Sequence, residues 1–562
     1  MLHAGLFIYN ARCHSPVYGE TGLFANGLAY WQFGRTDLVS ADPLIISALK
    51  TAPVALAGVR LPDQAANQRG MYAEYQMFEA LLAENGRSAI GWLSLARLPG
   101  LGFSLVGAYA CYRWARSLHG TGAALGALCL WCFSGLVIGH GALLTPDIAA
   151  ATMSVVAAGA LWRWMALPTV LRALAAAGAC GAMLATKVDT FILPLIWGIF
   201  AVRPLWRILR QAPRGYLWAV AQAAILLVGP LYTLNLLYGF KGSLTSLGRY
   251  DFQSRAMGAA FGPAAPIGLK DSEPGPLRQG DATSRWDWRK WPCPLPASYV
   301  RSVDARLHEL EWPTLAYLHG SWRLGGWWYY YPASFAAKES SGVILLCGVL
   351  LLSWAFARRL TVPAVFLLVS ASGPFALQAA LSKSSNQLRH VLPAIPFLYI
   401  LLSFSLSTTG RLAIRRIAVG CVVAAIVEGW WHFPHSLASF NLLHGGGHHG
   451  QDYLRNSGDL DWGQDLILLQ QWTEAHPEAR PLTLCYSGSF NSERIGGWGT
   501  DIEFVPDVPG VDRLTPGYYA IFKRKLYRPP REDDPMATFA QRVPTARVGY
   551  TVCIYQIEED GR

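Results

Sequence analysis

The sequence predicts a mainly α-helical, polytopic membrane protein, with extracytoplasmic loops around a transmembrane helix bundle and a small C-terminal α/β domain. Of its 562 residues, 52% are hydrophobic, 15% are charged and 22 are Trp. This composition is too apolar for an ordinary soluble chain of this length. Apolar runs of about 17–25 residues, enough for a helix to cross about 30 Å of hydrocarbon, recur between residues 98 and 431. The bilayer is therefore the expected solvent of the bundle.

Ten apolar segments are expected to form the bundle. They span residues 98–112, 122–142, 148–162, 171–186, 190–202, 216–239, 342–357, 361–380, 391–408 and 414–431. As alternating crossings, they separate their short loops into an Arg-rich set and a set with few cations. The first set holds Arg113, Arg116, Arg163, Arg172, Arg203, Arg207, Arg210, Arg214, Arg358, Arg359, Arg411, Arg415 and Arg416, and the second holds Lys187, Lys383 and Arg389. Because cytoplasmic loops carry the excess of Lys and Arg, the first set is expected to face the cytoplasm.

This topology divides the rest of the chain into three extracytoplasmic parts. Residues 1–97 precede the bundle of residues 98–431, a large loop at 240–341 interrupts it, and residues 432–562 follow it. In that last part, a helical pattern and strand-like runs predict an α/β domain. Residue 1 then lies outside, and since the apolar run at 4–11 is too short to cross the membrane, a crossing helix is expected to precede it.

The positive charge and the cysteines have structural explanations. The net charge of +11 comes mostly from Arg in short loops, so we expect no nucleic-acid partner. Cys129 and Cys132 form a CxxC motif inside an apolar run, where cysteine is a small core residue. Cys485 and Cys553 lie in strand-like segments, and the sequence leaves open whether they form a disulfide.

Several ionisable residues fall at the predicted outer ends of different helices. They are Arg97, Asp147, Lys187, Asp189, Lys338, Arg389 and His390. Each Lys or Arg alone could be an interfacial anchor whose charge reaches the headgroups. Asp147 is too short for that, and it either caps a helix or holds a substrate or metal. Together, cations beside a carboxylate suit a lipid phosphate at the headgroup boundary.

Ordered motifs along residues 15–490 resemble the GT-C membrane glycosyltransferases, in particular relatives of the protein O-mannosyltransferases and of the lipid A aminoarabinose transferase. The motifs are TPDIAAA at 145–151, ATKVDTFILPLIW at 185–197, GGWWYYYPASFAAK at 325–338, SSNQLRHVLPAIPFLYI at 384–400 and DLDWGQDL at 459–466. The resemblance implies an enzyme that moves a sugar from a polyprenyl-phosphate carrier to an acceptor on the extracytoplasmic face, with inversion. In a bacterium, that membrane is the cytoplasmic (inner) membrane.

The chain departs from this family at one expected catalytic position. The family has an acidic pair in its first outer loop, and here Gly19 stands where the Asp is expected, with Glu20 in the second place. Two interpretations stay open. Either Glu20 or Asp42 is the base, with Asp147 as the second carboxylate, or the chain is a catalytically degenerate relative.

The active interpretation gives each candidate residue a role. Glu20, Asp147 and Asp42 are the catalytic candidates, and Glu20 is the first choice for the base that takes the proton of the acceptor hydroxyl. The substrate-binding candidates are Arg97, Lys187, Arg389, His390 and Lys338, of which Arg97, Lys187 and Arg389 would stabilise charge on the leaving phosphate.

The sequence specifies the acceptor and the other partners of the reaction less closely than the donor. The acceptor is a lipid, a glycan or a protein, and membrane lipids are further partners. We assign no metal ligands and no certain cofactor, although a divalent cation held by Glu20 and Asp147 stays open. A transporter is the alternative from another class, but the chain shows no internal repeat and its charges lie at helix ends.

Overall fold

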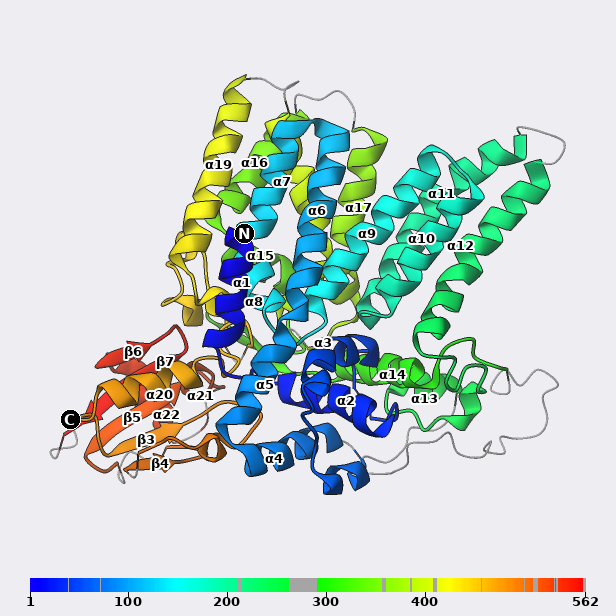
Figure 1. Ribbon diagram of the computed structural model, residues 1–562. Helices are drawn as coiled ribbons and strands as arrows, with labels where there is room; N and C mark the ends of the chain where they lie inside the picture. Colours follow the sequence, from blue (N-terminus) through cyan, green and yellow to red (C-terminus); the bar gives the residue numbers. More distant parts are fainter. Residues whose placement is uncertain are drawn as a thin grey trace.

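The computed structural model shows a helical bundle with a mixed assembly of helices and strands at one end (Figure 1). It describes residues 1–558 except 39, 71, 211–214, 262–290, 356–359, 385–386, 408–411, 456, 500, 509–513, 530 and 532–533. Four residues of the predicted cytoplasmic set, Arg214, Arg358, Arg359 and Arg411, lie outside the described residues, as does the middle of the predicted outer loop.

Each of the ten predicted apolar segments corresponds to one or more helices. The bundle helices are α6 (Pro99–His119), α7 (Thr121–Phe133), α8 (Gly135–Gly141), α9 (Asp147–Ala166), α10 (Val170–Leu184), α11 (Ile192–Arg210), α12 (Gly215–Leu237), α16 (Ser341–Ala355), α17 (Val362–Leu381), α18 (Ile395–Leu402) and α19 (Leu412–Trp431). Two 3₁₀ helices, η2 (Val188–Phe191) and η5 (Leu388–Ala394), lead into α11 and α18. One apolar cluster, which includes Trp131, Trp164 and Trp197, forms the bundle core.

Among the described residues, six stretches of helix are long and apolar enough to cross a membrane. They are Arg87–His119, Asp147–Ala166, Val188–Arg210, Gly215–Leu237, Val362–Leu381 and Leu388–Leu406. Two bent pairs, Thr121–Phe133 with Gly135–Gly141 and Tyr330–Lys338 with Ser341–Trp354, raise the number to eight if each pair is one span. The sequence predicted ten. The two others are α10, which has only 15 residues, and α19, whose 20 residues include Arg415, Arg416 and Glu428. The chain is a polytopic, mainly helical integral membrane protein.

The N-terminal part is helical and lies against one end of the bundle. Its helices are α1 (Leu2–Cys13), α2 (Glu20–Phe33), α3 (Leu44–Leu56), the 3₁₀ helix η1 (Asp63–Asn67), α4 (Ala73–Asn85) and α5 (Arg87–Arg97), which leads directly into α6. The short helix α1 is tied to the bundle because the two ring nitrogens of His3 lie 2.8 Å from Ser104 Oγ and from the carbonyl oxygen of Cys132.

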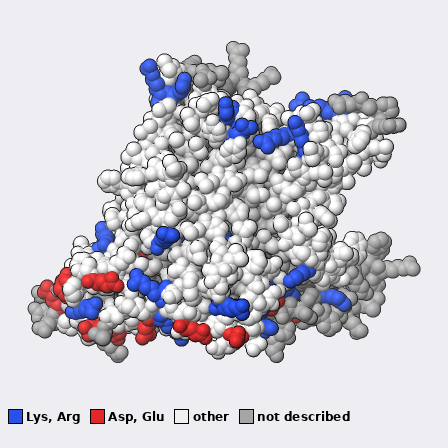
Figure 2. All heavy atoms as spheres, in the orientation of Figure 1, with Lys and Arg blue, Asp and Glu red and all other residues white. Residues whose placement is uncertain are grey.

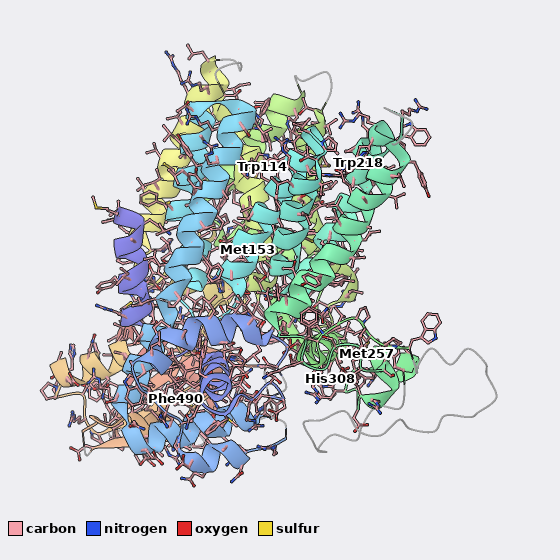
Figure 3. The ribbon with its side chains drawn as sticks, turned by 45° about the vertical axis from the view of Figure 1, so that its right-hand side comes forward. Trp114, Met153, Trp218, Met257, His308 and Phe490 are labelled. Carbon is pink, nitrogen blue, oxygen red and sulfur yellow. The ribbon has the colours of Figure 1, made fainter. Side chains whose placement is uncertain are left out.

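The predicted outer loop contributes a small set of elements between α12 and α16. They are the 3₁₀ helix η3 (Leu247–Arg249), α13 (Arg255–Phe261), α14 (Ala297–Glu311), the antiparallel hairpin β1 (Leu315–Leu318) and β2 (Ser321–Leu324), and α15 (Tyr330–Lys338). Figure 3 shows His308 of α14 and Met257 of α13 near each other at the end of the bundle. Helix α14 matters most here, because it brings Arg306 to the site described below.

The C-terminal part forms the predicted α/β domain. Its strands β3 (Leu482–Cys485), β4 (Ile502–Phe504), β5 (Gly517–Phe522), β6 (Ala546–Val548) and β7 (Val552–Ile557) form one sheet in the order β4-β3-β5-β7-β6. Strand β3 pairs in parallel with β4 and β5, whereas β7 pairs antiparallel with β5 and β6. Helices α20 (Leu466–Ala475), α21 (Lys523–Leu526) and α22 (Pro535–Gln541) accompany the sheet.

The sheet register shows that Cys485 and Cys553 do not form a disulfide. Cys485 of β3 is opposite Ile521 of β5, and Ile521 is opposite Cys553 of β7. The two cysteines are therefore two strands apart, about 9–10 Å, which exceeds the roughly 7 Å limit between the Cα atoms of a disulfide. Both thiols are free.

One hydrophobic core joins the N-terminal helices to the C-terminal sheet. It combines Phe24 and Phe78 from the first part with Leu484 and Phe522 from the last. The ring of Phe490 packs edge-on against that of Phe78, with ring centroids 6.4 Å apart, and Figure 3 shows Phe490 among these helices below the bundle. The two ends of the chain thus form one folded assembly.

Charged side chains are unequally distributed between the two ends of the bundle. On the face drawn in Figure 2, the coloured side chains at the upper end are Lys and Arg, whereas Asp and Glu lie at the lower end, over the C-terminal sheet and the N-terminal helices. The apolar surface of the bundle lies between these two charged ends.

A buried pair of side chains, His14 and Asp465, links the N-terminal part to the C-terminal domain. His14 Nδ1 lies 3.4 Å from Asp465 Oδ1, and His14 Nε2 lies 2.9 Å from the carbonyl oxygen of Pro434. A protonated ring suits both neighbours, because each of them presents an oxygen acceptor to a ring nitrogen. Burial opposes this charge, but the contacts with Asp465 and Cys13 outweigh it and raise the pKa of His14 to about 10.

The raised pKa of His14 predicts a loss of stability in alkali. A group whose pKa is higher in the folded state stabilises that state fully below its ordinary pKa of 6.5 and loses the effect as the pH rises towards 10. The difference in unfolding temperature between wild type and His14→Gln should therefore be largest near pH 6 and shrink steadily up to pH 10. Thermal unfolding in detergent over this range measures it. A His476→Gln control changes a ring that stacks on Trp472, and a wild-type advantage over His14→Gln that stays constant with pH would contradict the prediction.

Candidate active site

The site is built around Asp147, the first residue of α9. Its carboxylate is fully buried and caps no helix, since the N-cap residue is Pro146. Lys187 Nζ donates to Asp147 Oδ1 at 2.6 Å, and Arg389 Nη1 lies 3.6 Å from Oδ2. The start of a helix also favours a negative charge. Asp147 therefore pairs with two cations, a role that the sequence analysis did not consider.

A second carboxylate, Asp189, lies in η2 just beyond Lys187. Arg306 of α14 grips it with two hydrogen bonds, from Nε to Oδ1 at 2.8 Å and from Nη2 to Oδ2 at 3.0 Å. Arg306 Nη2 also lies 3.2 Å from His390 Nδ1, which must accept because a guanidinium can only donate. Despite burial, Asp189 and Glu309 raise the pKa of Arg306, so this side chain keeps its charge. The loop helix α14 is thereby fixed to the ends of the bundle helices.

Arg389 is the less tightly paired cation of the site. It lies in η5, its Nη1 is 3.9 Å from Asp42 Oδ2, and its Nε donates to the side chain of Gln387. Both Arg389 and Asp42 keep 17% of their side-chain surface exposed, in contrast to the buried Asp147. The guanidinium of Arg389 therefore has hydrogen-bonding capacity left for a ligand.

These side chains surround a small pocket that is partly open to solvent. It is lined by Ala41, Asp42, Lys187, Val188, Asp189, Arg306, Glu309, Arg389 and His390. Three cations and three carboxylates therefore face one small volume. Such a pocket can bind an anionic group through the cations and accept a proton at a carboxylate.

Asp42 is the carboxylate of the pocket best suited to accept a proton. It precedes Pro43, the N-cap residue of α3, and its backbone N–H donates to Ser40 Oγ at 3.2 Å. Burial raises the pKa of Asp42, although Arg389 and Lys187 counteract this. A carboxylate with a raised pKa is a better general base than an ordinary one.

Glu20 and Arg97, both site candidates from the sequence, do not line the pocket. They pair with each other, with Arg97 Nη2 2.5 Å from Glu20 Oε2 and Nε 2.9 Å from Oε1, and both are fully buried. The Glu20 oxygens also accept the backbone N–H groups of Val17 and Leu144. Both oxygens are therefore engaged, which leaves Glu20 poorly placed as a base.

Gly19, which stands where the resemblance led us to expect an Asp, has a backbone conformation that favours glycine. Gly19 has φ +97°, a conformation that residues with a Cβ rarely adopt. The turn into α2 is thus built for glycine.

Lys338, another predicted substrate-binding residue, lies outside the pocket. Its Nζ donates to the carbonyl oxygens of Leu437 at 3.0 Å and Asp459 at 2.5 Å, and it lies over the ring of Phe440. It is buried and does not line the pocket. The pocket therefore unites Asp42, Lys187, Arg389 and His390 beside Asp147, and leaves out Glu20, Arg97 and Lys338.

Three charged residues at or next to the site were missed by the sequence analysis. Arg306 and Glu309 lie in an outer-loop helix, and no sequence pattern distinguishes Arg306 from its neighbour Arg301. Lys50 of α3 is fully buried and donates to the carbonyl oxygens of Leu143 and Thr145, both at 2.8 Å. A single lysine inside the apolar run of α3 was the signal that could have identified it. Burial lowers the pKa of Lys50 to about 8.

The alternative of a divalent cation shared by Glu20 and Asp147 does not fit this geometry, because Glu20 is bound to Arg97 and Asp147 to Lys187. Among the residues that the structure describes, no three His, Cys, Asp or Glu side chains are grouped so that they could hold a metal ion.

Known proteins with a similar structure belong to the two groups that the motifs resemble. No protein-family model and no curated protein sequence matches the chain. Among solved structures, the chain is similar to ArnT from Cupriavidus metallidurans bound to undecaprenyl phosphate, with a TM-score of 0.46 and 12% identity over 98% of this chain and 96% of that one. It is also similar to the S. cerevisiae protein O-mannosyltransferase Pmt1-Pmt2 complex bound to the sugar donor, with a TM-score of 0.46 and 12% identity over 77% of this chain and 89% of that one. At these scores the likeness establishes neither a family nor a reaction.

Proposed function

We propose that this chain is a membrane glycosyltransferase that moves a sugar from a polyprenyl-phosphate carrier to a hydroxyl acceptor. The observation that carries the proposal is the pocket in which Lys187 and Arg389 lie beside Asp42 and Asp147 at the ends of apolar helices. Cations at that depth suit a phosphate on a lipid, because Arg presents several donors and Lys a point charge. The family resemblance of the motifs points to the same donor class.

In the proposed reaction, Asp42 takes the proton of the acceptor hydroxyl while that oxygen attacks the anomeric carbon of the donor sugar. The bond between the anomeric carbon and the phosphate oxygen breaks in the same step, so the configuration inverts. The leaving lipid phosphate gains negative charge, which Arg389 and Lys187 stabilise. Asp147 holds these two cations at the phosphate and takes no proton itself. Asp42 thus replaces Glu20 as the proposed base.

The proposed active face is extracytoplasmic. On the face drawn in Figure 2, the Lys and Arg side chains at the upper end of the bundle lie at the end opposite the C-terminal sheet of Figure 1, and loops rich in such residues stay in the cytoplasm. In a bacterial cell, this geometry corresponds to the outer surface of the inner membrane. The assay below distinguishes which sugar is transferred and whether the acceptor is a lipid, a glycan or a protein.

The proposal is tested by incubating the purified protein in nanodiscs with radiolabelled polyprenyl-phosphate sugars and membrane extract. Label should move to an acceptor fraction, and Arg389→Gln should lower the transfer rate by about 10–10²-fold, since one stabilising donor to a developing charge is worth up to about 10²–10³. Lys383→Gln is the matched control, because Lys383 is an exposed cation just before the same loop.

Two results would overturn the proposal. If no donor of this class yields a labelled product, the chain is a degenerate relative. If the donor or its sugar accumulates inside vesicles without covalent transfer, the chain is a transporter.

A further inference from the structure

The segment Ser457–Leu466 contacts three separate parts of the molecule. Towards the bundle, Asp459 accepts from Lys338 and from the start of η5. Towards the N-terminal part, the backbone N–H of Tyr18 donates to Trp462, and that of Ser15 donates to Gln464. Towards the sheet, Asp461 and Asp465 accept from Arg524 and Thr551. We call residues 457–466 the strap. Because it touches η5, it reaches the element that carries Arg389.

Asp459 fixes the start of η5. Its two carboxylate oxygens accept the backbone N–H of Leu388 at 3.1 and 2.9 Å, and Leu388 is the first residue of that helix. The carboxylate is 1% exposed, so this interaction is shielded from water. An acidic group at the N-terminus of a helix satisfies free N–H groups and suits the helix dipole. The backbone position of Arg389, the next residue, is set in this way.

Trp462 fixes the side chain of Arg389. The guanidinium carbon lies 5.1 Å from the centroid of the Trp462 ring, within the range of a cation–π interaction. Trp462 is itself 2% exposed and packs with Val17, Leu143 and Leu437. The carboxylates of Asp147 and Asp42 stand 3.6 and 3.9 Å from Arg389, so the indole and the hydrogen bond from Nε to Gln387 are the main supports of its orientation.

We propose that Asp459 and Trp462 are positioning residues that hold Arg389 towards the pocket, so that the strap makes the C-terminal part a component of the active site. This inference rests on the proposed function only for the identity of the ligand. The contacts themselves concern Arg389, whatever anion the pocket binds. A lipid-linked phosphate that needs Arg389 would bind less well once the ring beneath the guanidinium is removed.

The test compares Trp462→Leu and Trp462→Phe with wild type, as full-length protein in nanodiscs. A cation–π contact contributes about 0.5–2 kcal/mol, which corresponds to a change of about 2–30-fold in a binding constant. Trp462→Leu should raise the KM for the polyprenyl-phosphate sugar by about that factor with kcat changed less. Trp462→Phe retains an aromatic face and should restore most of the affinity.

Asp461→Asn is the matched control within the strap. Its carboxylate accepts the backbone N–H groups of Gly463 and Arg524, so it faces the sheet and not η5. This variant should leave the KM for the donor unchanged, whereas Asp459→Asn should raise it. If the Leu and Phe variants of Trp462 behave alike, or if their unfolding temperatures fall while KM stays constant, the positioning role is refuted.

A second measurement needs neither substrate nor transfer. Phenylglyoxal modifies exposed guanidinium groups, and mass spectrometry gives its rate at Arg389. Trp462→Leu should change this rate at least twofold, and Trp462→Phe should return it towards the wild-type value. An unchanged rate in Trp462→Leu refutes the positioning role. A changed rate in a protein that transfers no sugar upholds it and refutes the proposed function.

Discussion

Asp42→Asn should lower the rate of sugar transfer by about 10²–10⁴-fold, the usual contribution of a general base. The expectation rests on the place of Asp42 in the pocket, 3.9 Å from Arg389, and on burial, which raises the pKa of its carboxyl. A base must be ionised to act, so the wild-type rate should rise with pH as Asp42 loses its proton. The variant should lose this rising limb as well as the rate. Initial rates of label transfer between pH 4 and pH 8 measure both effects.

Two further variants test whether the loss of transfer is specific to Asp42. Asp63→Asn removes an exposed carboxylate from the same N-terminal part and should transfer at the wild-type rate. Glu20→Gln tests the base first expected from the sequence. If the folded Glu20 variant loses the rising limb and Asp42→Asn keeps it, the assignment of the base reverts to Glu20.

Arg97→Met should destabilise the protein by about 3–5 kcal/mol, the typical effect of removing one partner from a buried ion pair. The change leaves the Glu20 carboxylate buried with only the N–H groups of Val17 and Leu144. It also removes the donors to the carbonyl oxygens of Ala11, His14 and Ser15. The expected result is a low yield of monodisperse protein and a lower unfolding temperature in detergent. Size-exclusion chromatography after heating measures both.

Arg87→Met is the control that separates the loss of the Arg97–Glu20 ion pair from the general effect of removing an Arg from α5. Arg87 begins the same helix α5 and is exposed, so Arg87→Met should unfold close to the wild-type temperature. The sequence analysis expected Arg97 to stabilise the leaving phosphate. A well-folded Arg97→Met variant that cannot transfer sugar would restore that role and contradict the structural one.

The fold class could be predicted because it depends on properties local to the chain. An apolar run of sufficient length must become a helix in a bilayer, where no water satisfies the backbone. The fold class is confirmed, and even the bent pair Thr121–Phe133 and Gly135–Gly141 matches one apolar segment. Helix ends were less certain. Helix α6 continues to His119, beyond the charged Arg113 and Arg116, because long polar side chains at the membrane surface do not stop a helix.

The pocket could be predicted only in part. Asp147, Lys187 and Arg389 lie at the predicted outer ends of apolar segments, and topology alone brings such ends to one face. Topology does not say which of them touch. Glu20 and Arg97 pair across 77 positions of sequence, and Arg306 reaches Asp189 across 117. These contacts depend on how loops fold back onto the bundle, which hydrophobic periodicity does not encode.

The sequence showed residues 459–466 of the strap as a motif, but it did not show which parts of the molecule the strap contacts. Of the DLDWGQDL run, only Leu466 belongs to helix α20, which has Asp465 as its N-cap residue. A tryptophan between acidic residues gave no sign that it lies beneath Arg389. Only the arrangement of three distant segments around it shows that.

The core shared by the first and last parts of the chain has a consequence for biosynthesis. Leu466 and Ser15 are hydrogen-bonded although 451 positions separate them, so the earliest helices leave the ribosome long before their packing partners exist. Contacts of such long range close slowly, and exposed apolar surface invites aggregation meanwhile. A nascent chain stalled before residue 432 should therefore present α2, α4 and α5 as substrates for chaperones and proteases, while its membrane helices are already inserted.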